Sequence, residues 1–178
     1  MKRLLVVVDY QKDFVDGSLG FSEAQALEDP ICRKIEEYQK QKADIVFTYD
    51  THYPDYLQTQ EGTKLPVPHC FKNSPGWNLY GRVGSYCTDM TPCFYKPAFG
   101  SMELARFVQE KGYDLVELCG LVSNICVISN AVLVKAALPE ARVLVDAQCT
   151  GSGDAMLHEK ALDIMEGLQI EVFHRTSH

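Results

Sequence analysis

The chain has 178 residues, of which 46% are hydrophobic and 23% are charged, and its formal net charge is −7. This length is enough for one domain with its own core, and the composition is that of an ordinary globular protein. A negative chain without a basic stripe argues against nucleic acid or an acidic membrane surface as a partner. The apolar run near the start has five residues and ends at Asp9, which is too short for an export segment or a membrane span. Seven cysteines, an odd number without a CxxC pair, fit reduced thiols in a cytoplasm better than a disulfide framework.

Short apolar runs alternate with helical patterns along most of the chain. We expect, in chain order, a strand at 3–10, a helix at 31–42, strands at 44–50 and 93–95, a helix at 101–112, a strand at 114–120, a helix at 124–138, a strand at 141–146, a helix at 153–167 and a strand at 169–173. This alternation predicts one three-layer α/β domain over residues 1–178. Its six-stranded parallel sheet would carry helices on both faces, in a Rossmann-like arrangement.

Some helix ends carry their own signals. Asp29 and Pro30 are typical of an N-cap followed by proline at the first helical position. Ser101 is a candidate cap for the next helix, and Gly112 a candidate terminator.

The segment from Asp50 to about Pro92 breaks the alternation, and six of the eight prolines lie in it or just after it. Loops of this length inside a compact domain are usually functional. In an open α/β sheet, ligands bind beyond the carboxyl ends of the strands. Polar side chains occupy four of those predicted ends: Asp9, Asp50, Lys96 and Cys126.

Cys126 lies in the stretch GLVSNICVISNA, between a predicted strand and a predicted helix. A buried cysteine often behaves as a small hydrophobic residue. Alternatively, Cys126 is a nucleophile whose pKa is lowered by the helix N-terminus and by Lys96, with Asp9 accepting the thiol proton. Free N–H groups of the same turn could bind an oxyanion. Spacing alone leaves both interpretations open.

The long loop also contains a candidate metal site. Residues i and i+2 of an extended chain point the same way, so Asp50 and His52 can share one ion, with Glu61 and His69 further along. Carboxylate and imidazole together suit zinc, manganese or iron(II) rather than calcium. On spacing alone, ordinary loop residues are the simpler interpretation.

Three motifs, VVDYQKDF, YKPAFGS and GLVSNICV, together resemble the isochorismatase-like cysteine hydrolases, and most closely the nicotinamidases. The later stretch VDAQCTGSGDAMLHEKALDIM is also similar to that family, so the resemblance runs from the first strand to the last helix. It implies that Asp9, Lys96 and Cys126 form a catalytic triad. It further implies a non-proline cis peptide bond at Leu121–Val122, with the N–H groups of Val122 and Cys126 forming an oxyanion hole.

The same resemblance implies a metal centre at Asp50, His52 and His69 with Glu61 as the further ligand, and Asp55 is the alternative to Glu61. Zinc is the expected ion, with manganese or iron as alternatives. In nicotinamidases the ion holds the pyridine nitrogen, whereas relatives that act on isochorismate or carbamoyl substrates generally lack the metal set.

The resemblance also implies that Phe14 and Phe99 line the substrate pocket. The implied activity is hydrolysis of nicotinamide to nicotinate and ammonia through a thioester on Cys126, in NAD salvage, by a cytoplasmic enzyme that is expected to be a homo-oligomer.

A related C–N hydrolase acting on a ureido or carbamoyl amide is the nearest alternative. A non-catalytic redox-sensing thiol protein is the alternative from another class. The presence of Asp9 and Lys96 together favours catalysis, because a sensor needs a low thiol pKa but no proton acceptor.

Overall fold

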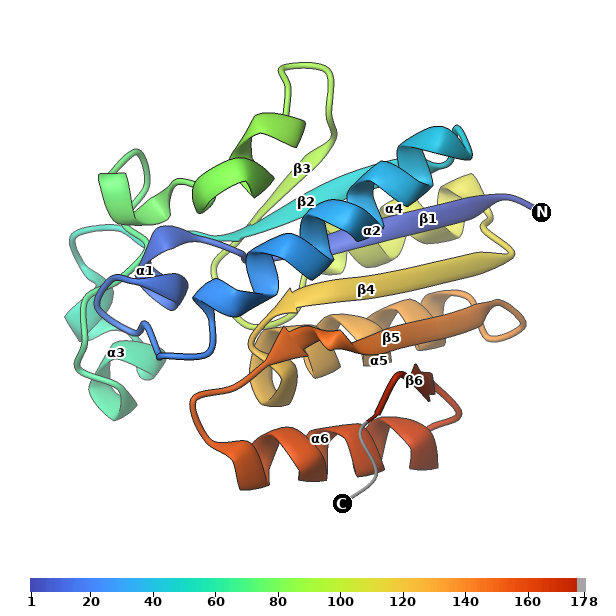
Figure 1. The fold of residues 1–178 in the computed structure, drawn as a ribbon. Coiled ribbons are helices and arrows are strands. Elements are labelled where there is room, and N and C mark those ends of the chain that lie inside the picture. Colours follow the sequence, from blue (N-terminus) through green and yellow to red (C-terminus); the bar gives the residue numbers. More distant parts are fainter. Residues whose placement is uncertain (176–178) are drawn as a thin grey trace.

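The computed structural model describes residues 1–175. Its strands are β1 (Arg3–Val8), β2 (Asp44–Asp50), β3 (Cys93–Lys96), β4 (Leu115–Leu121), β5 (Arg142–Gly151) and β6 (Glu171–Phe173). They form one six-stranded sheet in the order β3-β2-β1-β4-β5-β6, and every neighbouring pair is parallel (Figure 1). The predicted fold class is therefore confirmed.

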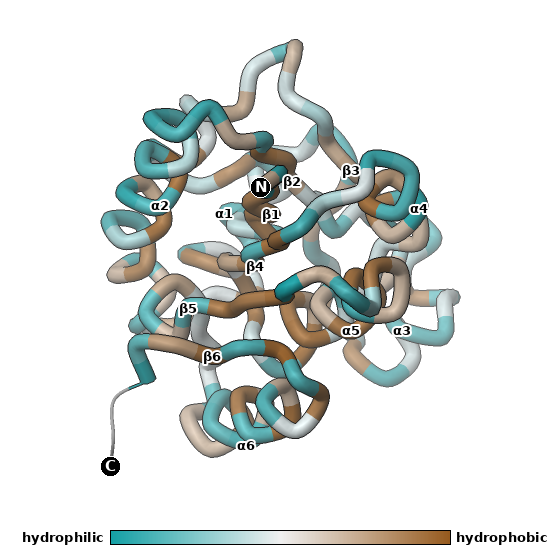
Figure 2. The backbone as a smooth tube through the Cα atoms, turned by 90° about the vertical axis from the view of Figure 1, so that its right-hand side faces the viewer, coloured by the Kyte–Doolittle hydropathy of each residue, from teal (hydrophilic) through white to brown (hydrophobic). Residues whose placement is uncertain are grey.

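The helices are α1 (Lys12–Val15), α2 (Glu28–Lys40), α3 (Gln60–Lys64), α4 (Met102–Lys111), α5 (Ile128–Ala137) and α6 (Ala155–Gly167). Figure 2 shows α2 on one side of the sheet and α4 and α5 on the other. Strand β1 explains this layering, since successive side chains of a strand point to opposite faces. Leu4, Val6 and Val8 belong to the buried cluster with α4 and α5, and Leu5 and Val7 to the cluster with α2. No helix within residues 1–175 is long and apolar enough to cross a membrane.

Helix α2 begins earlier than predicted, and Asp29 is not its N-cap. Leu27 occupies the cap position, and no side chain caps the helix there. The reason is that a short 3-10 turn, η1 (Gln25–Leu27), runs directly into α2. Pro30 lies in the first turn, where a missing N–H breaks no helical hydrogen bond.

The signals at the ends of α4 are confirmed. The Ser101 hydroxyl accepts a hydrogen bond from the Leu104 N–H at 3.0 Å, which satisfies one free donor of the first turn. Gly112 ends the helix in a left-handed conformation, with φ at +64°.

The chain after β4 differs from the single helix predicted at 124–138. Residues Ser123–Val127 form a π-helical turn, in which the Val127 N–H donates to the Val122 carbonyl at 3.1 Å, and α5 begins only at Ile128. Such turns are rare and occur frequently at functional sites. Strand β5 also runs on to Gly151, because its pairing with β4 resumes after an irregularity that interrupts the apolar pattern.

The strand order places the carboxyl ends of β1 and β4 side by side at the point where the order reverses. In doubly wound sheets, ligands bind in the crevice at this point. The long segment after β2 folds into α3 and three 3-10 turns, η2 (Tyr56–Gln58), η3 (Pro75–Trp77) and η4 (Gly81–Tyr86). In Figure 1, α1 and α3 lie with the neighbouring loops beyond these strand ends.

Candidate active site and metal-binding group

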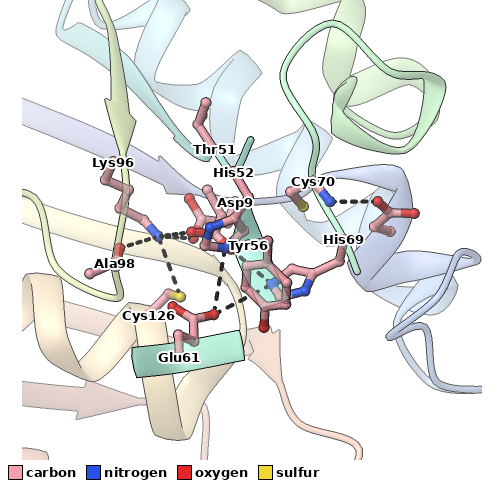
Figure 3. A network of polar contacts seen from close by, with 12 residues as sticks. Asp9, Thr51, His52, Tyr56, Glu61, His69, Cys70, Lys96, Ala98 and Cys126 are labelled. Atoms are coloured by element: carbon pink, nitrogen blue, oxygen red, sulfur yellow. Dashed lines mark hydrogen bonds and ion pairs between the residues drawn. The ribbon is translucent and has the colours of Figure 1, made fainter. Parts of the chain in front are cut away.

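Four adjacent strands end in, or lead directly to, the polar residues that the sequence singled out. Asp9 follows β1, and its left-handed backbone (φ +44°) turns the chain away from the sheet. Asp50 and Lys96 end β2 and β3 and are register partners. Cys126 lies in the π-helical turn after β4. The structure thus brings all four residues together around the Lys96 ammonium. Figure 3 shows Asp9, Lys96 and Cys126 in this arrangement.

Lys96 lies between the carboxylate and the sulfur of the proposed triad. Its Nζ is 2.5 Å from Asp9 Oδ2 and 3.5 Å from Cys126 Sγ, and it also donates to the Ala98 carbonyl at 3.1 Å. The three residues are 0%, 1% and 4% exposed in the order Asp9, Lys96, Cys126. The Thr48 hydroxyl donates to Asp9 Oδ1 at 2.6 Å, which leaves Oδ2 facing the ammonium. An ion pair this well buried holds its partners in one geometry.

Burial controls the protonation of these groups. It raises the pKa of the Cys126 thiol well above its usual value, with Lys96 opposing and the charge of Asp9 adding to the rise. Burial likewise raises the pKa of Asp9, against the opposing effect of Lys96. Burial alone would lower the pKa of Lys96, but the negative charges of Asp9, Cys126 and Asp50 outweigh it and raise that pKa.

The lowered thiol pKa expected from the helix terminus is therefore wrong for this structure, because burial outweighs the nearby ammonium. A protonated thiol needs a base, and the Asp9 carboxylate and the Cys126 sulfur both contact the Lys96 ammonium, at 2.5 and 3.5 Å. The redox-sensor interpretation requires an exposed, low-pKa sulfur at Cys126. The buried position of this sulfur argues against it.

The turn that carries Cys126 has a tightly defined backbone. Gly120 precedes it with φ at +105°, and any Cβ at this position would overlap the backbone of Val8 on the neighbouring strand, so only glycine fits. The peptide bond between Leu121 and Val122 is cis, as the resemblance implied.

Asn130 ties this turn to the segment that follows β3. Its Nδ2 donates to the Cys126 carbonyl at 2.8 Å and to the Phe99 carbonyl at 3.2 Å, and its Oδ1 accepts from the Ser101 N–H at 2.9 Å. The side chain is fully buried. One amide therefore couples the position of Cys126 to the chain beyond Lys96.

Asp50, His52, Glu61 and His69 each point one donor atom at the same place, with all four atoms within 4.8 Å of one another. His52 Nε2 lies 3.0 Å from Asp50 Oδ2 and 3.5 Å from Glu61 Oε1, and the corresponding distances from His69 Nε2 are 3.2 and 3.6 Å. Ligand atoms about 2.1 Å from one ion lie about 3.4 Å apart in a tetrahedron and about 3.0 Å apart at adjacent octahedral positions. These spacings and the mixed oxygen and nitrogen donors fit a divalent transition metal.

The groups around these side chains orient them. His69 Nδ1 lies 2.7 Å from the Val67 carbonyl, so it carries the proton and its Nε2 faces the other donors. The Tyr56 ring packs against the rings of His52 and His69, with centroids 4.6 and 5.0 Å away. Asp55, the alternative to Glu61, is exposed and lies outside the group.

Asp50 joins the two halves of the site. Its Oδ2 faces the histidines, and its Oδ1 lies 3.5 Å from Lys96 Nζ. Burial disfavours its charge, but the bonds from His52 and His69 and the charge of Lys96 hold its pKa below the usual value.

A cavity of about 650 Å³ opens onto this group and is lined in part by His52, Glu61, Phe99 and Ile125. Ile125 is the direct neighbour of Cys126, so the cavity reaches the edge of the turn that holds the sulfur. Phe99 is 45% exposed there. Phe14 is not among the lining residues, since it is buried and packs edge-on against the His69 ring at 5.6 Å.

Two residues that the sequence did not single out support the site: Gln11, which is buried, and Asp13, which is partly buried. Gln11 pairs with Asp50 and with the chain at Trp77, and Asp13 Oδ2 accepts from the Cys70 N–H at 2.7 Å, next to His69. Both lie in the motif VVDYQKDF that carries Asp9. Their position in the same motif as Asp9 is the sequence feature from which a role at the site could have been predicted.

We expect Gln11→Ala to lower the free energy of unfolding by about 3 kcal/mol. The side chain is fully buried, accepts from the Asp50 N–H at 2.8 Å and donates to the Asp50 and Trp77 carbonyls at 3.0 and 2.8 Å. Its removal leaves three backbone groups without these partners. Urea unfolding measures the change, with Gln39→Ala on the exposed face of α2 as the control. Equal stability of the two variants would show that the amide does not secure Asp50.

A family model described as the isochorismatase domain matches residues 3–176. The chain belongs to the isochorismatase family. Among its relatives, the nicotinamidase/pyrazinamidase of Mycobacterium tuberculosis (strain ATCC 25618 / H37Rv) is 27% identical over an alignment of 189 positions, which covers 96% of this chain and 97% of that protein.

Solved structures share the fold of this isochorismatase-family chain. The nicotinamidase/pyrazinamidase from Bacillus subtilis superposes with a TM-score of 0.86 at 24% identity, covering 97% of this chain and 99% of that one. The pyrazinamidase of Pyrococcus horikoshii in complex with zinc gives 0.83 at 22%, with coverage of 98% and 100%. The N-carbamoylsarcosine amidase from Thermoplasma acidophilum gives 0.80 at 23%, with coverage of 97% and 95%.

Proposed function

We propose that this isochorismatase-family hydrolase converts nicotinamide to nicotinate and ammonia. The observation that carries the proposal is the junction at Asp50, where a buried Asp–Lys–Cys cluster adjoins a group of two histidines and two carboxylates. The relative named nicotinamidase/pyrazinamidase supports the substrate, and the neighbour solved in complex with zinc supports a metal.

In the proposed reaction, Cys126 gives its proton to Asp9 as its sulfur attacks the carboxamide carbon. Lys96 stays protonated, because its pKa is raised, and stabilises both the forming thiolate and the carboxylate. The N–H groups of Val122 and Cys126 receive the oxyanion. Asp9 then returns the proton to the departing ammonia, which leaves a thioester on Cys126.

Water completes the cycle. It loses a proton to Asp9 as it attacks the thioester carbon, and the returning proton restores the Cys126 thiol when nicotinate leaves. The raised pKa of Asp9 suits a carboxylate that accepts and releases a proton in each half of the reaction.

Asp50, His52, Glu61 and His69 would hold one divalent cation, for which zinc is our first choice and manganese or iron(II) the alternatives. When bound, the ion supplies a Lewis-acid contact that fixes the pyridine nitrogen and so orients the ring. Phe99 would cover the ring from the cavity wall.

Phe14 would support that pocket from behind His69. The homo-oligomer and the cytoplasmic location expected from the sequence stay predictions.

A hydrolase for a carbamoyl or ureido amide is the second candidate, supported by the structural similarity to N-carbamoylsarcosine amidase. The purified, zinc-loaded protein should release ammonia from nicotinamide with a kcat/KM at least about 100-fold above that for N-carbamoylglycine. A coupled ammonia assay on both compounds measures this. Turnover of the carbamoyl compound alone, with zinc bound, would replace the first proposal by the second.

A further inference from the structure

A pair of thiols outside the active site lies at the start of β3. Cys87 follows the turn η4, Cys93 opens the strand, and their sulfur atoms are 3.4 Å apart. The residues between them form an exposed loop at the top of Figure 1. A disulfide bond is about 2.0 Å long, so a movement of about 1.4 Å would join the two sulfurs.

The surroundings make the two thiols chemically different. The Tyr49 hydroxyl donates to Cys87 Sγ at 3.5 Å, and Cys93 Sγ lies 3.4 Å from the same sulfur and 3.4 Å from the Thr91 carbonyl oxygen. The hydrogen bond from Cys93 is the main cause that lowers the pKa of Cys87 to about 6, with Tyr49 adding to it and burial and Asp89 opposing. The same interaction raises the pKa of Cys93. The pKa values of the two neighbouring thiols therefore shift in opposite directions, as in a pair in which one sulfur reacts with an oxidant and the other closes the disulfide.

The other five cysteines have neither an exposed sulfur nor a lowered thiol pKa. All of them are buried, whereas Cys87 and Cys93 are partly exposed. Burial raises the thiol pKa at each of these five positions: Cys32, Cys70, Cys119, Cys126 and Cys149. Since the thiolate is the reactive form, we expect an oxidant in solution to react with Cys87 first.

We propose that Cys87 and Cys93 form a peroxide-reactive dithiol site that closes to an intramolecular disulfide while Cys126 stays reduced. The Cys87 thiolate attacks one oxygen of hydrogen peroxide, so that an S–O bond forms, the O–O bond breaks and the other oxygen leaves as water after taking a proton. The Cys93 sulfur then attacks the sulfenic acid of Cys87, so that the S–S bond forms and the S–O bond breaks. The Cys93 proton leaves with the departing oxygen as a second water. The two sulfurs lose two electrons, and the peroxide gains them.

The disulfide would leave the active site in place. Cys93 pairs with Phe47 at the start of β3, and Lys96 pairs with Asp50 at its end, so the new bond lies at the other end of the strand from the triad. The dithiol site therefore does not depend on which amide the enzyme hydrolyses.

The whole protein, treated with one equivalent of hydrogen peroxide and then unfolded and alkylated, tests the proposal. Trypsin, which does not cleave between Lys96 and Pro97, yields a peptide of residues 83–106 with Cys87 and Cys93 as its cysteines. We expect this peptide to be two hydrogens lighter and unalkylated, and its thiols to be lost at least about tenfold faster than the Cys126 thiol. Full alkylation of both cysteines, or oxidation of Cys126 at the same rate, would overturn the proposal.

Two variants identify the attacking sulfur. Cys93→Ser should accumulate a sulfenic acid at Cys87 that dimedone traps, because no thiol is present to close the bond. Cys87→Ser should leave Cys93 reduced at the same dose, and the matched control Cys32→Ser should form the disulfide as the parent does. Dimedone labelling of Cys93 in the Cys87→Ser protein, at the rate seen for Cys87, would contradict the assigned order.

Discussion

Replacing Cys126 by serine is expected to lower kcat/KM for nicotinamide by at least about 10⁴-fold. The hydroxyl is nearly as large as the thiol, so the buried turn should keep its shape. Its proton is far more tightly held than that of a thiol, and Asp9 would have to remove it without the soft nucleophile that sulfur provides. Ammonia release under single-substrate steady-state conditions measures the loss.

Cys149→Ser is the matched control for this change. Cys149 is 3% exposed, against 4% for Cys126, and it lies on β5 in the core cluster next to α2. We expect this variant to keep kcat/KM within about threefold of the parent, and both variants to fold, as circular dichroism can verify. A Cys126→Ser protein that retains a tenth of the parent activity would remove Cys126 from the role of nucleophile.

The positions of the strand ends could be predicted from the sequence because they follow from a few strong rules. Apolar runs of strand length that alternate with helical patterns allow few topologies other than a parallel sheet. In such a sheet, Asp9, Asp50 and Lys96 must all emerge at the same edge, and the structure has them there. The charge state of Cys126 could not be predicted in this way, because it depends on how completely the surrounding chain excludes water.

The local departures from the predicted elements have similar causes. The start of α2 depends on the preceding turn at Gln25–Leu27, which runs directly into the helix. Capping signals in the sequence do not indicate such a turn. The π-helical turn at Ser123–Val127 depends on one extra residue in each hydrogen-bonded ring, which leaves the apolar periodicity almost unchanged. The extension of β5 depends on an irregularity in its pairing with β4, where the partner of Leu118 is Val145 and the partner of Gly120 is Thr150. Glu61 could be proposed only by resemblance, since α3 brings it back to Asp50 and His52 from a loop without periodicity.

The carboxylate of Asp50 couples the Asp9–Lys96–Cys126 cluster to the group of Asp50, His52, Glu61 and His69. One oxygen faces Lys96 and the other faces the two histidines, and Gln11 holds the Asp50 backbone on both sides. A displacement of the ligand group therefore displaces the ammonium that pairs with Asp9. Loss of the ion should accordingly affect the chemical step as well as substrate binding.

His52→Ala is expected to lower the bound zinc from about one ion per chain to less than about a tenth, and kcat/KM for nicotinamide by about 10²- to 10³-fold. The change removes the donor that lies closest to Asp50, at 3.0 Å, and leaves three ligands around a gap. If the pyridine ring is not fixed, the carboxamide carbon lies next to the Cys126 sulfur in a smaller fraction of the bound complexes. Metal analysis of the freshly purified protein and steady-state ammonia release give the two numbers.

His174→Ala is the matched control for this histidine, because the His174 side chain is 57% exposed and contacts Asp146 at the far end of the sheet from the ligand group. It should keep both the zinc and the activity. A carbamoyl hydrolase that needs no ion would lose the zinc on His52→Ala and keep its turnover of N-carbamoylglycine, which would separate it from a nicotinamidase. Retention of a full zinc ion by His52→Ala would instead remove His52 from the ligand set, and the group at Asp50 would need another explanation for its converging donors.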